Sequence, residues 1–339
     1  MTNVHDLDLN DKSILVTGGT GSFGRHFIKT VGERYKPRRL IVFSRDELKQ
    51  YEMAEEFKQT DYPFLRYFIG DVRDRSRLEM AFHDVDYVIH AAAMKQVPTA
   101  EYNPFECINT NVMGAENVVQ AAMRSGVSRV VALSTDKAAN PINLYGASKL
   151  ASDKIFIAAN NLSGSEKLRF AVVRYGNVMG SRGSVVPFFE KLIREGAQDL
   201  PITDERMTRF WISLQHGVDF VLSSLSMMRG GEVFVPKIPS LSIVDLAKHM
   251  APDLPLRKVG IRPGEKLHEI MITEDDSRTT LDLSDRYVIE PAFPFWSRKS
   301  YTDEGAKQVD EGFVYSSDKN ADWLDGKQLE ALLASRKND

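Results

Sequence analysis

Short, continuously apolar segments recur along the first half of the chain, and stretches with apolar residues at helical spacing, such as residues 111–125, lie between them. Uninterrupted rather than alternating hydrophobicity is typical of strands that are covered on both faces. The pattern therefore predicts an α/β fold with a doubly wound parallel sheet wrapped by helices. The segments expected to form this sheet are KSILVTG, RRLIVFS, FLRYFIGD, VDYVIHAAA, SRVVALST and LRFAVVRYG.

The pattern changes beyond about Gly180, where proline-containing loops, short helices and isolated strands such as EVFVP follow. We expect residues 1–180 to form the main domain, to which some later strands and helices return, and residues 181–339 to form mainly a smaller lobe and a tail. The patch WLDGKQLEALL predicts a helix docked on the surface. Because doubly wound folds bind ligands at the carboxyl edge of the sheet, the smaller lobe should carry substrate specificity.

Composition narrows the class of partner and the compartment. The 44 Lys and Arg residues against 47 Asp and Glu give a net charge of −3, so we expect neither nucleic acid nor a membrane surface as a partner. The polar N-terminus, the lack of an apolar run of about 20 residues and the single cysteine, Cys107, favour a soluble cytoplasmic protein. The scattered His90, His216 and His268 have no metal-ligand spacing, and we expect no metal.

A glycine-rich turn follows the first predicted strand, in the segment ILVTGGTGSFG. Gly18, Gly21 and Gly24 have the spacing that lets a backbone turn approach a pyrophosphate at the N-terminus of a helix. Mere packing of a strand-to-helix turn is the alternative. The motif favours a Rossmann-like dinucleotide site, to which Thr20, Ser22 and Phe23 would contribute.

The end of the second predicted strand carries a hydroxyl and cations instead of a lone acid. Ser44, Arg45 and Lys49 suit a 2′-phosphate, which favours NADP over NAD. Asp46 would instead bond a ribose hydroxyl, and a solvated charged turn is the alternative for all four residues. Further expected cofactor contacts at later strand ends are Asp71 and Val72 for adenine, Ala91 for the nicotinamide ribose, and Lys95 and Val178.

Tyr145 and Lys149 lie four residues apart in the segment NLYGASK, after the fifth predicted strand, and should share one helical face. We expect the Lys149 ammonium, together with a positive nicotinamide, to lower the pKa of the Tyr145 phenol so that it can take a proton from an alcohol. An exposed helix pair is the alternative.

These motifs resemble the extended short-chain dehydrogenase/reductases, by Thr17 to Gly24, the HAAA strand end and Y-x-x-x-K. Within them the chain is similar to the inverting UDP-N-acetylglucosamine 4,6-dehydratases that begin pseudaminic acid synthesis. The matching segments, such as FSRDELKQ, HAAAMKQVPTAEYNP, LSTDKAANPINLYGASKLASDK, RYGNVMGSRGSVVPFF and IRPGEKLHEIMI, span most of the chain from Gly18 to about Met271. The resemblance implies NADP, UDP-N-acetylglucosamine as substrate and a homo-oligomer.

The resemblance also implies a role for Thr135, Asp136 and Lys137. In it Tyr145 and NADP⁺ oxidise C4 of the sugar, Lys137 removes the C5 proton, and Asp136 assists loss of water at C6. Thr135 would bond the C4 oxygen. Lysine can be the base only if its pKa falls by several units from about 10.4, and a surface ion pair or loop cap is the alternative.

Matching positions imply contacts to the nucleotide sugar by Lys95, Asn177, Arg182, Thr203, Arg209, Arg262 and Glu265, each of which would otherwise be an ordinary surface residue. Two rivals remain. A 4-epimerase or 4-ketoreductase would use the same cofactor and tyrosine but leave Asp136 and Lys137 without a role. A non-catalytic NADP-sensing scaffold would not need Tyr145 or Lys149.

Overall fold

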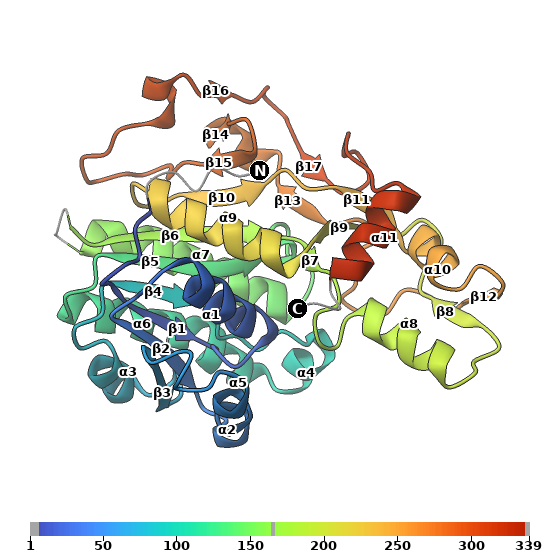
Figure 1. Ribbon diagram of the computed structural model, residues 1–339. Helices are drawn as coiled ribbons and strands as arrows, with labels where there is room; N and C mark the ends of the chain where they lie inside the picture. Colours follow the sequence, from blue (N-terminus) through green and yellow to red (C-terminus); the bar gives the residue numbers. More distant parts are fainter. Residues whose placement is uncertain (1–6, 164–166, 336–339) are drawn as a thin grey trace.

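The computed structural model describes residues 7–163 and 167–335. Within them a 10-stranded sheet runs in the order β16-β14-β15-β10-β6-β5-β4-β1-β2-β3, with helices on both faces (Figure 1). The six predicted segments form six adjacent parallel strands of this sheet, which confirms the doubly wound α/β fold. These strands are β1 (Ser13–Thr17), β2 (Arg39–Ser44), β3 (Leu65–Ile69), β4 (Tyr87–His90), β5 (Arg129–Thr135) and β6 (Arg169–Tyr175).

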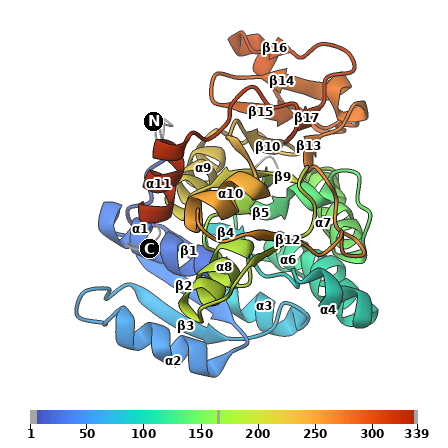
Figure 2. The same ribbon diagram turned by 90° about the vertical axis from the view of Figure 1, so that its right-hand side faces the viewer.

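The helices cover the two faces because each presents an apolar stripe to the sheet. On one side α1 (Ser22–Arg34) packs against α9 (Leu214–Met227), and on the other α6 (Gly114–Arg124) packs between α3 (Arg75–Ala81) and α7 (Leu144–Leu162) (Figure 2). The helix expected over residues 111–125 is α6, preceded by a π-helical turn, Asn109–Met113. The remaining helices near the parallel strands are α2 (Glu47–Glu56), α4 (Val97–Tyr102) and α5 (Pro104–Ile108).

The second half of the chain returns to the sheet. The expected strand EVFVP is β10 (Val233–Pro236), which pairs in parallel with β6. Beyond it, β15 (Arg286–Ile289), β14 (Thr280–Asp282) and β16 (Lys307–Gln308) add antiparallel strands. The core that these strands complete runs unbroken across the sheet and includes Val172, Phe234 and Val288.

A smaller lobe projects from the sheet, on the right of Figure 1. It has its own apolar cluster, in which Phe189, Leu246 and Leu329 are buried. Leu329 belongs to the predicted surface-docked helix, which is α11 (Gly326–Ser335). The other elements after β6 are β7 (Asn177–Val178), α8 (Val185–Arg194), β8 (Leu200–Ile202), β9 (Thr208–Ile212), β11 (Ser240–Ser242), α10 (Ile243–Met250), β12 (Leu256–Lys258), β13 (Ile270–Ile272) and β17 (Tyr315–Ser316).

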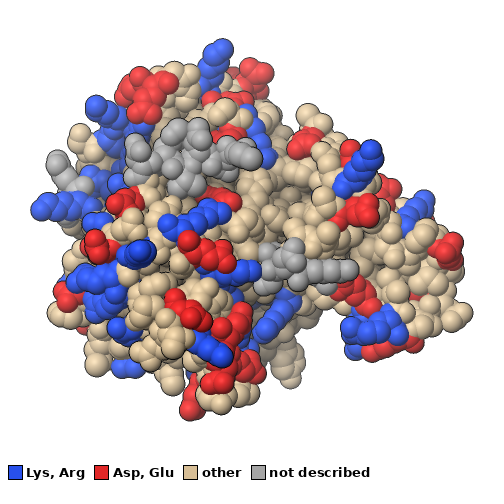
Figure 3. Space-filling model, viewed as in Figure 1, with Lys and Arg blue, Asp and Glu red and all other residues tan. Residues whose placement is uncertain are grey.

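Two features of the whole molecule concern its surroundings: the hydrophobicity of its helices and the distribution of charge on its surface. Across residues 7–163 and 167–335, no helix is long and apolar enough to span a bilayer. On the face shown in Figure 3, basic and acidic side chains lie interspersed, as the near-zero net charge predicts.

Candidate active site

A pocket of about 680 Å³ lies along the carboxyl edge of the parallel strands. Its wall is made by residues at the ends of β1 to β6 and by the first turns of α1 and α7. The predicted cofactor residues meet on this wall, although they come from distant parts of the sequence. They are Gly18, Thr20, Gly21, Ser22, Phe23, Gly24, Ser44, Arg45, Asp46, Lys49, Asp71, Val72, Ala91, Lys95, Tyr145, Lys149 and Val178.

The glycine turn has the shape that a pyrophosphate requires. Gly18 has a φ of +66°, and a Cβ there would lie 2.9 Å from the backbone nitrogen of Ala92. Gly21 is the N-cap of α1 and provides no side chain to cap its first turn, so the N–H groups of that turn stay available to an anion. The turn therefore fits the diphosphate of a dinucleotide.

The charges at the end of β2 are partly balanced within the protein. The Thr20 and Ser44 hydroxyls are hydrogen bonded at 2.9 Å, while Lys49 pairs with Asp46 at 2.9 Å. Arg45 lies 3.7 Å from Asp71. Both cations remain largely exposed at the pocket wall, so a phosphate can still reach them, and the choice between NADP and NAD stays a prediction.

Tyr145 and Lys149 lie on the same wall, on the first turns of α7. Asn143 caps this helix by accepting a hydrogen bond of 2.7 Å from the Gly146 N–H. Lys149 is buried and donates to the Leu133 carbonyl at 2.8 Å. Burial raises the pKa of Tyr145 to about 12, although the charge of Lys137 and a hydrogen bond with Thr135 act to lower it.

The expected lowering of the Tyr145 pKa by Lys149 is therefore wrong for the protein alone. Removal of the phenol from water outweighs the charge of Lys137, and burial also lowers the pKa of Lys149. The positive charge of a nicotinamide was part of the expectation and would act in the opposite direction to burial.

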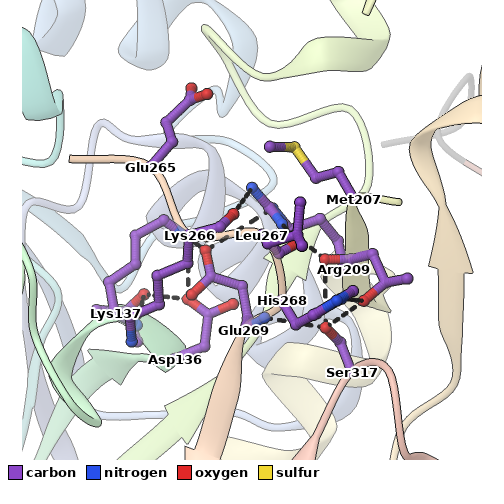
Figure 4. A network of polar contacts seen from close by, with 12 residues as sticks. Asp136, Lys137, Met207, Arg209, Glu265, Lys266, Leu267, His268, Glu269 and Ser317 are labelled. Atoms are coloured by element: carbon purple, nitrogen blue, oxygen red, sulfur yellow. Dashed lines mark hydrogen bonds and ion pairs between the residues drawn. The ribbon is translucent and has the colours of Figure 1, made fainter. Parts of the chain in front are cut away.

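Lys137 lies between two buried carboxylates, as Figure 4 shows. Its Nζ is 3.1 Å from Asp136 Oδ1 and 3.0 Å from Glu269 Oε1. The 3-10 turn Asp136–Ala138, directly after β5, places Asp136 and Lys137, and Thr135 donates to Asp136 Oδ1 at 2.8 Å. Asp136 is 1% exposed, so the surface ion pair considered from the sequence is excluded.

The charges around Lys137 decide the direction in which its pKa is shifted. Burial lowers the pKa of Lys137, but the charges of Asp136 and Glu269 outweigh burial and raise the pKa above its ordinary value. The protein alone therefore does not give Lys137 the lowered pKa that was the condition for its role as a base. Burial, followed by the charge of Glu269, raises the pKa of Asp136, which favours a proton on this carboxylate.

Glu269 received no role from the sequence, although it stands within the segment IRPGEKLHEIMI. It directly precedes β13 and meets Lys137 only through the fold. No spacing could have signalled this contact, because 132 positions separate the two residues.

The expected substrate residues divide into two groups. Lys95, Asn177 and Arg182 line the pocket, and the Lys95 ammonium donates to the Arg182 carbonyl at 3.1 Å. Four others are not part of the pocket wall and stay predictions or need correction: Thr203, Arg209, Arg262 and Glu265.

Arg209 needs correction. Its guanidinium donates to the carbonyls of Thr208, Leu267 and Lys266 at 2.7, 3.1 and 3.0 Å, and its Nε lies 3.7 Å from Glu269. The side chain therefore supports the loop and the carboxylate instead of presenting a free fork to a pyrophosphate.

The other three residues lie elsewhere in the lobe. Thr203 donates to the sulfur of Met207 at 3.0 Å, and Arg262 pairs with Glu265 at 3.7 Å in an exposed position. Across the parts of the chain that the structure describes, no group of three or more His, Cys, Asp or Glu side chains could hold a metal ion.

Comparison with known proteins agrees with this geometry. The sequence profile of the polysaccharide biosynthesis protein family matches residues 14–291. A UDP-N-acetylglucosamine 4,6-dehydratase (inverting) of Campylobacter jejuni is 59% identical over 330 residues, which cover 96% of this chain and 98% of that protein. A UDP-glucose 4-epimerase of Rickettsia canadensis is 42% identical over 306 residues, covering 88% and 89%.

Two solved structures share the fold. Pen from Bacillus thuringiensis has a TM-score of 0.88 and 37% identity, covering 98% of this chain and 99% of that one. DesIV, a dTDP-glucose 4,6-dehydratase of Streptomyces venezuelae with NAD and TYD bound, has a TM-score of 0.67 and 25% identity, covering 75% and 86%. Because the family profile covers residues 14–291, which include the glycine turn and the Tyr145–Lys149 pair, the chain belongs to the polysaccharide biosynthesis protein family.

Proposed function

We propose that this chain is a C5-inverting UDP-N-acetylglucosamine 4,6-dehydratase, a lyase that catalyses the first step of pseudaminic acid synthesis. The product would be UDP-2-acetamido-2,6-dideoxy-β-L-arabino-hex-4-ulose. One observation carries the proposal: the ion pair of buried Asp136 and partly exposed Lys137 stands beside Tyr145, and Lys137 and Tyr145 both line the pocket proposed for the nicotinamide. Oxidation alone needs no such acid and base, whereas elimination of water needs both.

The cofactor in this proposal is NADP. Ser44, Arg45 and Lys49 supply a hydroxyl and two cations at the pocket wall, which suits a 2′-phosphate. The glycine turn, with the available N–H groups of α1, would hold the diphosphate of this cofactor. When bound, the cofactor would supply the hydride chemistry: removal of a hydride from C4 of the sugar and its return to C6.

Tyr145 takes the proton of the C4 hydroxyl, and Thr135 bonds the C4 oxygen. The phenol must lose its proton first, so the positive charges around it carry part of the catalysis. Lys149 and Lys137 are the nearby ammonium groups, and both line the pocket with Tyr145. The resulting C4 ketone makes the neighbouring C5 proton acidic.

Asp136 and Lys137 then carry the elimination. A proton shift across the 3.1 Å between Lys137 Nζ and Asp136 Oδ1 converts ammonium and carboxylate into amine and carboxylic acid. The amine removes the C5 proton while the acid protonates the departing C6 hydroxyl, which leaves as water. This step restores the original ion pair, and a proton added to C5 from the opposite face balances the one that Tyr145 removed.

A 4-epimerase is the second candidate, because the relatives include UDP-glucose 4-epimerases. Such an enzyme would use Tyr145 and Lys149 but leave the buried pair of Asp136 and Lys137 without a role. A non-catalytic scaffold would have no use for a tyrosine and lysine placed on a cofactor pocket. The mass of the product separates the first two, since dehydration removes one water and epimerisation leaves the mass unchanged.

The test is incubation of the purified protein with UDP-N-acetylglucosamine in heavy water, without added reductant. We expect a 4-keto-6-deoxy sugar with deuterium at C5 by NMR, and loss of this product in Lys137→Ala with nucleotide binding retained. A product isomeric with the substrate would refute the proposal. We further propose a cytoplasmic homo-oligomer, which fractionation and light scattering would check.

A further inference from the structure

Glu269 is held rigidly in the protein interior. Its backbone N–H donates to the Ser317 hydroxyl at 2.9 Å, and its carbonyl accepts from the Ser317 N–H at 2.8 Å. The residue is 1% exposed and directly precedes β13. These two bonds fix the main chain of Glu269, and burial leaves its carboxylate little room to turn away from Lys137.

The charges around Glu269 form an arrangement with unused hydrogen-bonding capacity. Glu269 Oε1 lies 3.0 Å from Lys137 Nζ and 3.7 Å from Arg209 Nε, while Glu269 Oε2 and Asp136 Oδ2 are buried without a hydrogen-bond partner in the described structure. Lys266 is a further cation near the two carboxylates, and it donates to the Ala139 carbonyl.

Stability alone does not explain this arrangement. Buried polar atoms are normally hydrogen bonded, and two orphaned carboxylate oxygens beside one lysine cost stability. Unpaired buried polar groups and perturbed titration concentrate at functional sites. Lys137 is the member of the cluster that reaches the pocket wall, so the effect of Glu269 is passed on through this ammonium.

We propose that Glu269 is a positioning residue for the elimination, holding the Lys137 amine beside Asp136 and stabilising the ammonium that forms as the C5 proton is removed. The inference rests on the dehydratase function proposed above. A base whose protonated form is stabilised by a fixed negative charge is a stronger base. The same charge also favours the protonated form of Asp136, so it keeps in place the proton that Asp136 must donate.

A pH profile tests this role. Dehydration requires one shared proton on the Asp136–Lys137 pair, so its kcat should be bell-shaped with pH. A negative neighbour raises both apparent pKa values of the Asp136–Lys137 pair, and its removal lowers both. The groups that face the pair are Glu269, Arg209, Lys266 and Tyr145, and only the first is altered. In Glu269→Gln we expect the whole bell to move to lower pH by about one to three units.

The same variant should lower kcat at the wild-type optimum by about tenfold or more, with the KM for UDP-N-acetylglucosamine within about twofold. Glu232→Gln is the matched control. It removes another fully buried carboxylate, paired with Arg298 at 3.1 Å, and should leave the pH profile in place even if it lowers the melting temperature. A Glu269→Gln profile that superimposes on the wild type would overturn the proposal.

Glu269→Asp keeps the negative charge but moves it away from Lys137 by the length of one methylene. This variant therefore tests the positioning role if Glu269→Gln does not fold. The pH optimum of kcat in this variant should stay near that of the wild type while the value of kcat falls. An unchanged kcat would count against the positioning role. Failure of the dehydratase function itself is seen separately, because the wild-type protein would then release no water from the substrate. The positioning role would be refuted along with it.

Discussion

Replacement of Lys137 by methionine should destabilise the protein in a pH-dependent way. Methionine keeps most of the apolar stem of the side chain but removes the cation that lies 3.1 Å from Asp136 and 3.0 Å from Glu269. At an effective dielectric constant of about 20, each contact corresponds to about 5 kcal/mol of Coulomb energy. Hydration of the lysine, whose side chain is 27% exposed, offsets most of it, and we expect a net loss of about 3 kcal/mol near neutral pH.

The pH dependence follows from the two carboxylates left facing each other. Without the cation their pKa values in the folded protein rise above those in the unfolded chain, so the folded state binds more protons. The cost is then small below the unfolded carboxyl pKa of about 4 and grows as pH rises through the folded values. Urea-unfolding midpoints at pH 5 and pH 8 measure it, and we expect the larger loss at pH 8.

A matched control is Lys237→Met, which removes a cation of similar exposure whose partner, Asp282, has a side chain that is 43% exposed instead of buried. Exposed pairs contribute little, so its effect should stay below about 1 kcal/mol at either pH. An equal loss at pH 5 and pH 8 in Lys137→Met, or no loss at all, would show that the two carboxylates do not depend on this lysine for their charge.

Three further changes test other parts of the structure. Gly18→Ala forces a Cβ to within 2.9 Å of the Ala92 backbone at a φ of +66°, so it should cost about 1–3 kcal/mol and weaken dinucleotide binding, measured by calorimetry. Arg45→Ala with Lys49→Ala should reduce affinity for NADPH about tenfold more than affinity for NADH, and equal losses would contradict the 2′-phosphate assignment. His90 is buried, and burial lowers its pKa to about 3, so the free energy of unfolding should fall as pH drops from about 6.5 toward 3. His90→Gln should reduce this dependence on pH. An unchanged dependence would contradict the assignment of the effect to His90.

The sheet and the cofactor pocket follow from local sequence patterns. Each parallel strand is a continuous apolar run because both of its faces are covered, and the glycine turn needs its residue types for a positive φ and close approach. Tyr145 and Lys149 share a face because a helix repeats every 3.6 residues. These features depend on near neighbours in the chain, so they could be predicted.

The electrostatics of the site depend on distant contacts and could not be predicted. Lys137 has a raised rather than a lowered pKa because the charges of Asp136 and of Glu269, which is far along the chain, together outweigh its burial. Arg209 looked free to bind phosphate, but three backbone carbonyls occupy its guanidinium. Residue type and spacing show neither which groups will lie beside a buried charge nor whether backbone carbonyls will accept the hydrogen bonds of a side-chain donor.

The pairing of β6 with β10 has a consequence for synthesis of the chain. The first six strands end at Tyr175, yet the outer edge of β6 is covered only when Val233 and Phe234 add to it. Until that later segment leaves the ribosome, the nascent sheet presents an open, apolar edge of the kind that invites intermolecular pairing. A fragment truncated after β6 should therefore aggregate, and the dinucleotide half would not serve as an independent module.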